Sequence, residues 1–544
     1  MDATMARVVR VATLVLGVAL VIPLVSATAG STGSVLDAGT IRVALGSEPP
    51  SLDPQLGADT VSAQVTLSIM DPLVVLRGEN LRPVPNLASG WTVGGGGKTY
   101  TIHLRHTGRW TNGDPVTASD FEYSWKRELD PALAAPYAYI MYGIKGALAY
   151  NTCKQNCARL RDRVGVKALD RYTIRVTLER PQPWFPYLLA HNVFFAVPRA
   201  TVERWGNKWT EPSHIVTNGA FRLVRWRHDA EVDLAKWSGW RNASRVPIEN
   251  VKLPIITNGT TAVLAFQAGR VDALTTQMLG PADIPRFKGK PDYYESPQLA
   301  TYYVGFNLKK VTDVNQRRAM AMAIDRRALV DHVTFSGEPA EGFTPRGIPG
   351  FASIDPHSRF LPARANLAAA KALMAKVAHP VKKITLYYPN APGGKEMTVV
   401  LQAMWQQLGI STTLHAQEFK QFLQFLGPPP NSDVDTFMLS WVYDFPDAMN
   451  GFELFICGSG NNNTNRCNRH SDALVARARP VQDADLRYRL YGGIEQAMFG
   501  PNGDMPVVPL YWGANVALVG PRIRDTFRID PQTYIHFDEI KVKQ

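Results

Sequence analysis

The chain has 544 residues, too many for one hydrophobic core, so we expect about two to four domains. Hydrophobic residues make up 45% of the chain and charged residues 19%, an ordinary balance that excludes a disordered or low-complexity protein. The net charge of +12 is not gathered into Lys/Arg runs with interleaved aromatic residues, so nucleic acid is not an expected partner.

The first residues have the pattern of an export signal. Arg7 and Arg10 precede an apolar run over residues 11–24, and Ala27 and Ala29 give the small-x-small pattern that signal peptidase accepts. This run is shorter than the about 20 residues that a membrane helix needs. We therefore predict that residues 1–29 are a cleaved signal, with a retained N-terminal anchor as the alternative.

The next hundred residues predict strands, a hairpin and a capped helix. Residues 40–45 have the pattern of a strand and residues 61–69 that of a helix. Residues 87–91 and 99–105 flank a four-glycine turn and predict a hairpin with one buried face. Thr117 and Asp120 have the spacing of a capping box, which predicts a helix from there to about Leu129.

Within the hairpin, Gly97-Lys98-Thr99 resembles the end of a phosphate-binding loop. The glycine that this motif requires five positions earlier is Thr92, and a strand follows where a helix should begin. A nucleotide-binding function is therefore excluded.

The second half of the chain alternates predicted strands and helices. The strands cover residues 302–307, 384–388, 410–414 and 436–443, and the helices include a long one over 313–333 and an amphipathic one with Met397, Leu401 and Trp405 on one face. Such alternation predicts a mostly parallel sheet covered on both faces.

The strand that begins at Thr436 ends near Tyr443, because Pro446 cannot continue a ladder. Asp444 therefore lies just past the carboxyl end of a strand, where open α/β sheets place their ligand crevices. With Trp441 and Tyr443 beside it, this carboxylate is a candidate receptor for an ammonium group. The alternative is an Asx-turn residue that only ends the strand.

The four cysteines of an exported chain are expected to form disulfides. Their spacing pairs Cys153 with Cys157 and Cys457 with Cys467, each closing a small polar loop. A metal site that adds His470 to the second pair is a weaker alternative, since a structural zinc site needs a fourth ligand.

The motifs of common enzymes are absent from the sequence: it contains no Gly-x-Ser-x-Gly elbow, no His-Glu-x-x-His zinc helix and no calcium-binding loop. Aromatic residues and one well-placed acid remain, which favours a binding protein over an enzyme. We expect neither a cofactor nor a catalytic metal.

Several separated stretches resemble the family 5 solute-binding proteins, the oligopeptide-, dipeptide- and nickel-binding receptors of bacterial ABC importers. The resemblance begins with residues 87–91, 98–105 and 110–121, and it continues in the family's order through 218–223, 269–272, 303–307 and 317–326. It extends from about residue 40 to the C-terminus.

This resemblance implies an α/β fold of the periplasmic-binding-protein type (class II) with an extra subdomain, mixed sheets flanked by helices, and a ligand cleft between two lobes. Lobe I would comprise residues 38–80, 215–300 and 508–544, the extra subdomain residues 81–214, and lobe II residues 301–507. In peptide-binding members an Asp three residues after a Trp binds the ligand's α-ammonium group, a spacing that Trp441 and Asp444 preserve. Cys457 and Cys467 also resemble a disulfide of the dipeptide-binding branch.

The expected function is that of an exported receptor, monomeric and without enzymatic activity, that captures short peptides and delivers them to the permease of an ABC importer. It would act in the periplasm or at the extracellular face of the cell membrane. Many members are lipoproteins, but no cysteine lies near the predicted cleavage site, so a lipid anchor is not implied. The alternatives are the same fold with an oligosaccharide or a metal chelate as ligand, and a secreted hydrolase.

Overall fold

The computed structural model describes residues 39–57, 59–77, 81–353, 360–391, 393–427 and 430–543. The predicted export signal, residues 1–29, lies outside this part. Residues 38–544 cluster as one compact unit, so the lobe and subdomain boundaries stay a prediction. Among the described residues, no helix is long and apolar enough to cross a membrane.

The first sheet, near the N-terminus, has four strands. In spatial order they are β1 (Thr40–Arg42), β10 (Asn250–Pro254), β9 (Glu231–Lys236) and β8 (Phe221–Arg227). Only the β1–β10 pair is parallel. Helix α1 (Thr60–Ile69) begins where the Asp59 carboxylate accepts hydrogen bonds from the amides of Val61 and Ser62, and it packs against β8.

A second four-stranded sheet lies within residues 81–214. Its order is β4 (Ala88–Gly94), β5 (Thr99–Leu104), β7 (Thr173–Thr177) and β6 (Val166–Asp170), all antiparallel. Alternation buries Tyr100, Ile102 and Leu104 on one face, which confirms the predicted hairpin. Gly95–Gly97 form a single 3-10 turn that joins the two strands, and the strand β5 follows it.

The capping box is also confirmed at the start of α2 (Ala118–Glu128), where the Asp120 carboxylate accepts from the Thr117 amide at 2.8 Å. A two-stranded ribbon comes just before this sheet in the chain, and four further short α-helices lie within the described residues 81–214. They are β2 (Val74–Arg77) and β3 (Arg82–Pro85), α3 (Ala147–Asn151), α4 (Cys157–Arg161), α5 (Phe185–Leu188) and α6 (Arg199–Trp205).

The largest sheet has seven strands and is mixed. Its order is β11 (Ala273–Thr275), β17 (Val507–Val519), β12 (Tyr293–Phe306), β16 (Thr436–Val442), β14 (Lys383–Pro389) and β15 (Ser411–Gln417), with β13 (Glu338–Pro339) paired to β17. Only the pairs β16–β14 and β14–β15 are parallel. The prediction of a mostly parallel sheet is therefore wrong, because β16 also pairs antiparallel with β12, which lies far away in the sequence.

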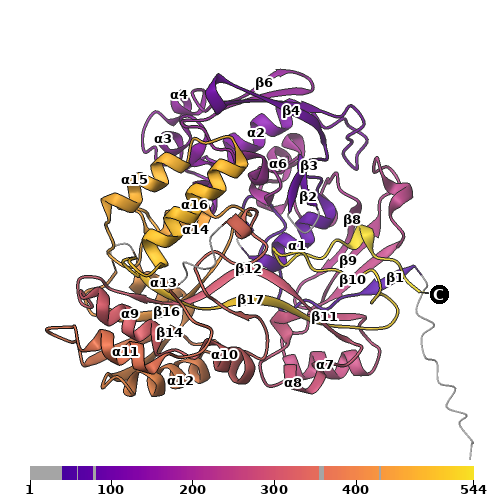
Figure 1. Cartoon of the computed structure of the whole chain (residues 1–544). Helices are drawn as coiled ribbons and strands as arrows, with labels where there is room; N and C mark the ends of the chain where they lie inside the picture. The colour runs from indigo at the N-terminus through magenta and orange to yellow at the C-terminus, as the bar shows by residue number, and fades with distance from the viewer. Residues whose placement is uncertain are drawn as a thin grey trace, which may run out of the picture. The chain divides into compact units, whose positions relative to one another are not determined.

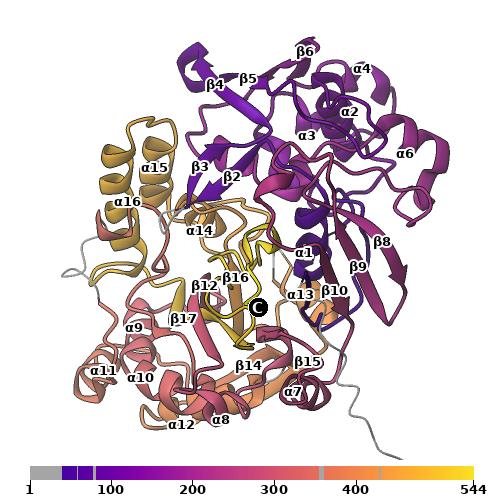
Figure 2. The same ribbon diagram turned by 90° about the vertical axis from the view of Figure 1, so that its right-hand side faces the viewer.

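Helices surround this sheet in Figures 1 and 2. They are α7 (Gly259–Gln267), α8 (Ile284–Phe287), α9 (Val314–Met322), α10 (Arg326–Leu329), α11 (Leu367–Met374), α12 (Gly394–Gln406), α13 (Phe419–Leu426), α14 (Met449–Phe452), α15 (Arg469–Ala478) and α16 (Ala484–Phe499). The amphipathic face of α12 is buried through Met397, Leu401 and Trp405, as the spacing predicts.

The single helix predicted over residues 313–333 is broken into α9, α10 and a following turn. Asp325 caps α10, its carboxylate accepting from the Ala328 amide at 2.8 Å. The fully buried Arg326 guanidinium donates to the carbonyl oxygens of Pro509 at 2.8 Å and Ala321 at 3.1 Å. A buried cation needs such acceptors, which here come from the end of α9 and from β17.

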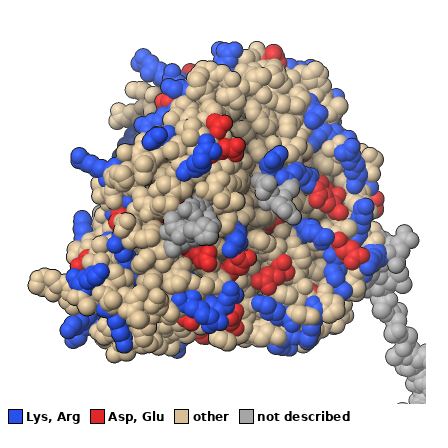
Figure 3. Space-filling model, viewed as in Figure 1, with Lys and Arg blue, Asp and Glu red and all other residues tan. Residues whose placement is uncertain are grey.

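Both predicted disulfides are present. Cys153 and Cys157 are bonded, with a Cα–Cα distance of 5.6 Å, and so are Cys457 and Cys467, at 4.5 Å. On the face in Figure 3, basic side chains are interspersed with acidic ones and form no single large patch.

Candidate functional site

The side chains of Trp441 and Asp444 line one cavity of about 410 Å³. Trp441 lies near the end of β16, and Asp444 lies two residues past that end, as predicted. The opposite wall comes from the region of the second sheet and includes Tyr139, Tyr142, Arg180 and Trp184. The cavity thus forms where segments far apart in the sequence meet.

An asparagine fixes both predicted ligand residues. The Asn450 side-chain oxygen accepts from the Trp441 indole nitrogen at 2.9 Å and from the Asp444 amide at 3.1 Å. Its Nδ2 donates to Asp444 Oδ2, also at 3.1 Å. Since Asn450 is buried on α14, it holds the carboxylate and the indole at a defined place in the cavity wall.

The Asp444 carboxylate forms no ion pair with any residue of the described part of the chain. Its side-chain hydrogen bond comes from Asn450. Burial raises the pKa of Asp444 from 3.8 to about 6, although the Asn450 hydrogen bond opposes the shift. A partly buried carboxylate of this kind is poised to gain from a cation brought by a ligand.

Tyr137 and Tyr139 lie close enough to this carboxylate for its charge to act on them, and Tyr139 lines the large cavity. Burial first, and then the charge of Asp444, raise the pKa of Tyr137 to about 12 and that of Tyr139 further still. Phe445 stacks on Trp184, with 6.3 Å between the ring centroids and 4° between the planes. Aromatic surface from both walls therefore surrounds the acid.

Tyr443 lies elsewhere. Its side chain is buried, and a side chain at Gly451 would come within 2.3 Å of its hydroxyl oxygen. Tyr443 is not among the residues that line the cavity, so this geometry gives the predicted ligand contact no support. Successive residues point in different directions, and here Asp444 faces the cavity while Tyr443 packs into the core.

A second, smaller cavity of about 50 Å³ also reaches Asp444. Leu67, Val75 and Leu76 form much of its wall, and Tyr534 and His191 add polar atoms. Burial lowers the pKa of His191 to about 4, so this imidazole is neutral at pH 7. Asp444 thus lies between a large cavity lined by both polar and aromatic residues and a small, mostly apolar one.

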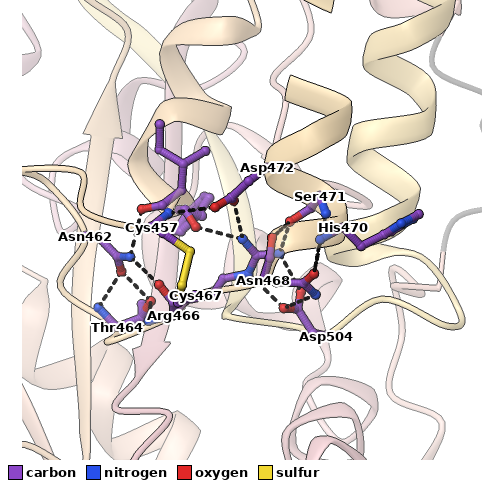
Figure 4. The surroundings of a disulfide bond; sticks show 12 residues. Cys457, Asn462, Thr464, Arg466, Cys467, Asn468, His470, Ser471, Asp472 and Asp504 are labelled. Atoms are coloured by element: carbon purple, nitrogen blue, oxygen red, sulfur yellow. Dashed lines mark hydrogen bonds and ion pairs between the residues drawn. A yellow bond between two sulfur atoms is a disulfide. The ribbon is translucent and has the colours of Figure 1, made fainter. Parts of the chain in front are cut away.

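The disulfide between Cys457 and Cys467 closes a loop whose Ser459 and Asn461 line the large cavity. Figure 4 shows the bond beside the buried Arg466, whose guanidinium pairs with Asp504 at 2.8 Å. The two sulfur atoms are bonded to each other, which leaves no thiolate for the alternative metal site. Within the described chain, no group of three or more His, Cys, Asp or Glu side chains is placed to hold a metal ion.

Sequence reasoning missed most of the cavity wall, including Asn450, Glu453 and Arg479. Arg479 follows the last residue of α15, a position where cations commonly stabilise helix ends, so nothing in its local pattern marks it as functional. The aromatic residues Tyr139, Tyr142 and Trp184 also line the cavity, but aromatic residues are equally common in a hydrophobic core, so the sequence alone does not mark them as ligand contacts.

The fold and a cavity that presents an acid among aromatic residues define a solute-binding protein. The family model of the bacterial extracellular solute-binding proteins, family 5, matches residues 82–463, and the chain belongs to this family. The solved structures that it resembles have the same two-lobed α/β fold.

Two relatives and one solved structure illustrate the range of this family. The probable deoxycholate-binding periplasmic protein YgiS of Escherichia coli is 31% identical, over 91% of this chain and 92% of the relative. The periplasmic oligopeptide-binding protein OppA of Salmonella typhimurium is also 31% identical, over 91% of each chain. The crystal structure of Haemophilus influenzae OppA in complex with RPPGFSPFR has a TM-score of 0.74 and 26% identity, covering 93% of this chain and 99% of that one.

Proposed function

We propose that this chain is an exported receptor that encloses a short peptide and delivers it to the permease of an ABC importer. The observation that carries the proposal is the partly buried Asp444 carboxylate, which lines the cavity without a cationic partner among the described residues. The α-ammonium group of a peptide supplies that partner. Relatives named as oligopeptide-binding proteins support the same ligand class.

In this proposal Asp444 pairs with the ligand's ammonium group and Trp441 packs beside it. Lobe I comprises residues 38–80, 215–300 and 508–544, the extra subdomain residues 81–214, and lobe II residues 301–507. Binding would close the lobes by a hinge motion. The protein would act as a monomer outside the cytoplasm, without enzymatic activity.

A bile acid is the second candidate ligand, because one 31%-identical relative is named a probable deoxycholate-binding protein. Deoxycholate has a carboxylate and no ammonium group. It would therefore leave Asp444 unpaired in the cavity, at the cost of keeping a desolvated charge without compensation. This favours a peptide over a bile acid.

Thermal shift with a panel of ligands tests the proposal. A ligand that binds only the folded chain stabilises it by about 2.7 kcal/mol at a hundredfold excess over Kd. We expect a raised melting temperature with di- and tripeptides but not with sugars, metal chelates or deoxycholate. A shift with deoxycholate alone would replace the peptide by a bile acid, and peptide fragments in the mass spectrum after incubation would indicate a hydrolase.

A further inference from the structure

A group of basic side chains lies outside the cavities that reach Asp444. Residues 145–175 contain eight Lys or Arg and two acids, Asp162 and Asp170. We call the eight the basic surface, and none of them lines either cavity. They are Lys145, Lys154, Arg159, Arg161, Arg163, Lys167, Arg171 and Arg175, of which all but Arg161 are exposed. Figures 1 and 2 both show α4 and β6, which carry part of this surface, at the end of the molecule opposite α12.

The strand register places like charges of this surface side by side. Lys167 on β6 is directly opposite Arg175 on the antiparallel strand β7. Ile174 and Val176 are buried, so alternation puts Arg175 on the exposed face of the sheet. Like charges directly opposite each other across two strands are destabilising. Lysines often protect a sheet edge such as β6, but β7 is an inner strand, so edge protection does not account for Arg175.

The chain does not neutralise these charges itself. On the neighbouring helix α2, Lys126 pairs with Glu122 at 2.7 Å, whereas no residue of the basic surface forms an ion pair with an acid of the described chain. The Asp170 carboxylate instead accepts a hydrogen bond from the amide of Tyr172 at 2.8 Å, within the β6–β7 turn. The excess positive charge is therefore open to an anionic partner outside the chain.

Exposed leucines lie among these cations. Leu148 on α3 is 52% exposed, and Leu169, two residues after Lys167 on β6, is 40% exposed. The Gly165 amide donates to the carbonyl oxygen of Lys145 at 2.7 Å, which ties the segment before α3 to the start of β6. Cations with apolar side chains among them are typical of surfaces that lie in a membrane interface. A soluble polyanion would attract the cations but would gain nothing from the leucines.

We propose that the basic surface binds an anionic membrane, with lipid phosphate groups paired to its Lys and Arg side chains. Leu148 and Leu169 enter the boundary between headgroups and acyl chains. This inference goes beyond the proposed function and does not depend on the ligand of the large cavity. It orients the chain with α4 and β6 towards the lipid and α12 away from it.

Sedimentation with lipid vesicles tests the inference. At about 0.1 M salt, where the Debye length is about 10 Å, the unaltered protein should bind vesicles made of equal amounts of phosphatidylglycerol and phosphatidylcholine. It should not bind vesicles of phosphatidylcholine alone. Raising the salt to about 1 M should abolish binding, because the Debye length falls to about 3 Å.

A variant with four charges removed tests the residues. Arg159→Gln, Arg163→Gln, Lys167→Gln and Arg175→Gln together should weaken binding to the mixed vesicles at least about 100-fold, since each Lys or Arg near an anionic surface contributes about fivefold. The variant relieves the repulsion between Lys167 and Arg175, so its melting temperature should not fall. Lost vesicle binding is then not a consequence of unfolding.

The matched control removes four lysines at the opposite end of the molecule. Lys371→Gln, Lys376→Gln, Lys382→Gln and Lys383→Gln change the net charge by the same amount. All four lysines are exposed, on α11, just after it and at the start of β14. This control should bind the mixed vesicles as the unaltered protein does.

The leucines distinguish a membrane from a soluble polyanion. Leu148→Ser combined with Leu169→Ser should weaken binding to the mixed vesicles about tenfold or more, because two apolar side chains stay in water. Its binding to soluble polyphosphate should equal that of the unaltered protein.

Several results would overturn the inference. One is equal binding, or none, to the two kinds of vesicle. Another is a four-charge variant that binds as well as the unaltered protein, or a control that loses as much binding as that variant does. If the leucine variant binds the mixed vesicles with unchanged affinity, a soluble polyanion such as a wall polymer replaces the membrane as the partner.

Discussion

The substitution Asp444→Asn tests whether Asp444 binds the ligand or is only a turn residue that ends β16. The substitution keeps the volume of the side chain and removes its charge. In the ligand-free protein burial raises the pKa of this carboxyl from 3.8 to about 6. At about 1.36 kcal/mol per pKa unit, the ionised form is disfavoured by at most about 3 kcal/mol, reduced in practice by solvent in the cavity.

The raised pKa of Asp444 decides whether Asp444→Asn stabilises or destabilises the ligand-free protein. The folded chain binds the Asp444 proton more tightly than the unfolded chain does, so this group disfavours folding increasingly as the pH rises from about 4 through about 6. At pH 7.5 the ligand-free Asp444→Asn protein should therefore melt at the same temperature as the unaltered protein, or higher. At pH 4 the two proteins should melt together.

Ligand binding should respond in the opposite direction. The peptide ammonium loses its only charged partner, which typically costs about 2–5 kcal/mol, or about 30-fold or more in Kd. Calorimetry with Ala-Ala-Ala at pH 7.5 measures this loss, and N-acetyl-Ala-Ala-Ala should bind the unaltered protein poorly for the same reason. A lower ligand-free melting temperature together with unchanged peptide affinity would refute the reasoning and leave Asp444 as a turn residue.

Peptide affinity should fall about tenfold per pH unit below about pH 6, because Asp444 becomes protonated there while the peptide amine stays charged. A peptide affinity that is constant from pH 5 to 7.5 would contradict this prediction. In the unaltered protein the Asp447 carboxylate lies 3.7 Å from the buried Arg487 guanidinium. Asp447→Asn removes this anion and leaves the buried cation unpaired, so it should lower the free energy of unfolding in urea titrations by about 1–3 kcal/mol. Replacing Cys457 and Cys467 by Ser should cost about 3 kcal/mol by the loop-entropy relation, and peptide mapping without reduction should find the two cysteines bonded to each other in the exported protein.

Short-range patterns in the sequence determined much of the local structure. The capping box at Thr117, the hairpin around the four-glycine turn and the end of β16 before Asp444 are all present where the pattern places them. Each depends on interactions between residues only a few positions apart, so the composition of a short window decides it. The paired cysteines belong to the same class, since each disulfide closes a short loop.

Only the tertiary structure decided the pairing of the large sheet and the composition of the cavity. The neighbour of β16 is β12, more than a hundred residues away, and its antiparallel direction leaves no trace in the alternation of strands and helices. Arg479 and Trp184 line the same cavity because packing of the whole chain brings α15 and the segment before α5 to the same place. Packing around the end of β16 likewise decides that Asp444 lines the cavity and Tyr443 does not. The alternating pattern of a strand shows which residues share a face, but it does not show whether that face meets a cavity or the core.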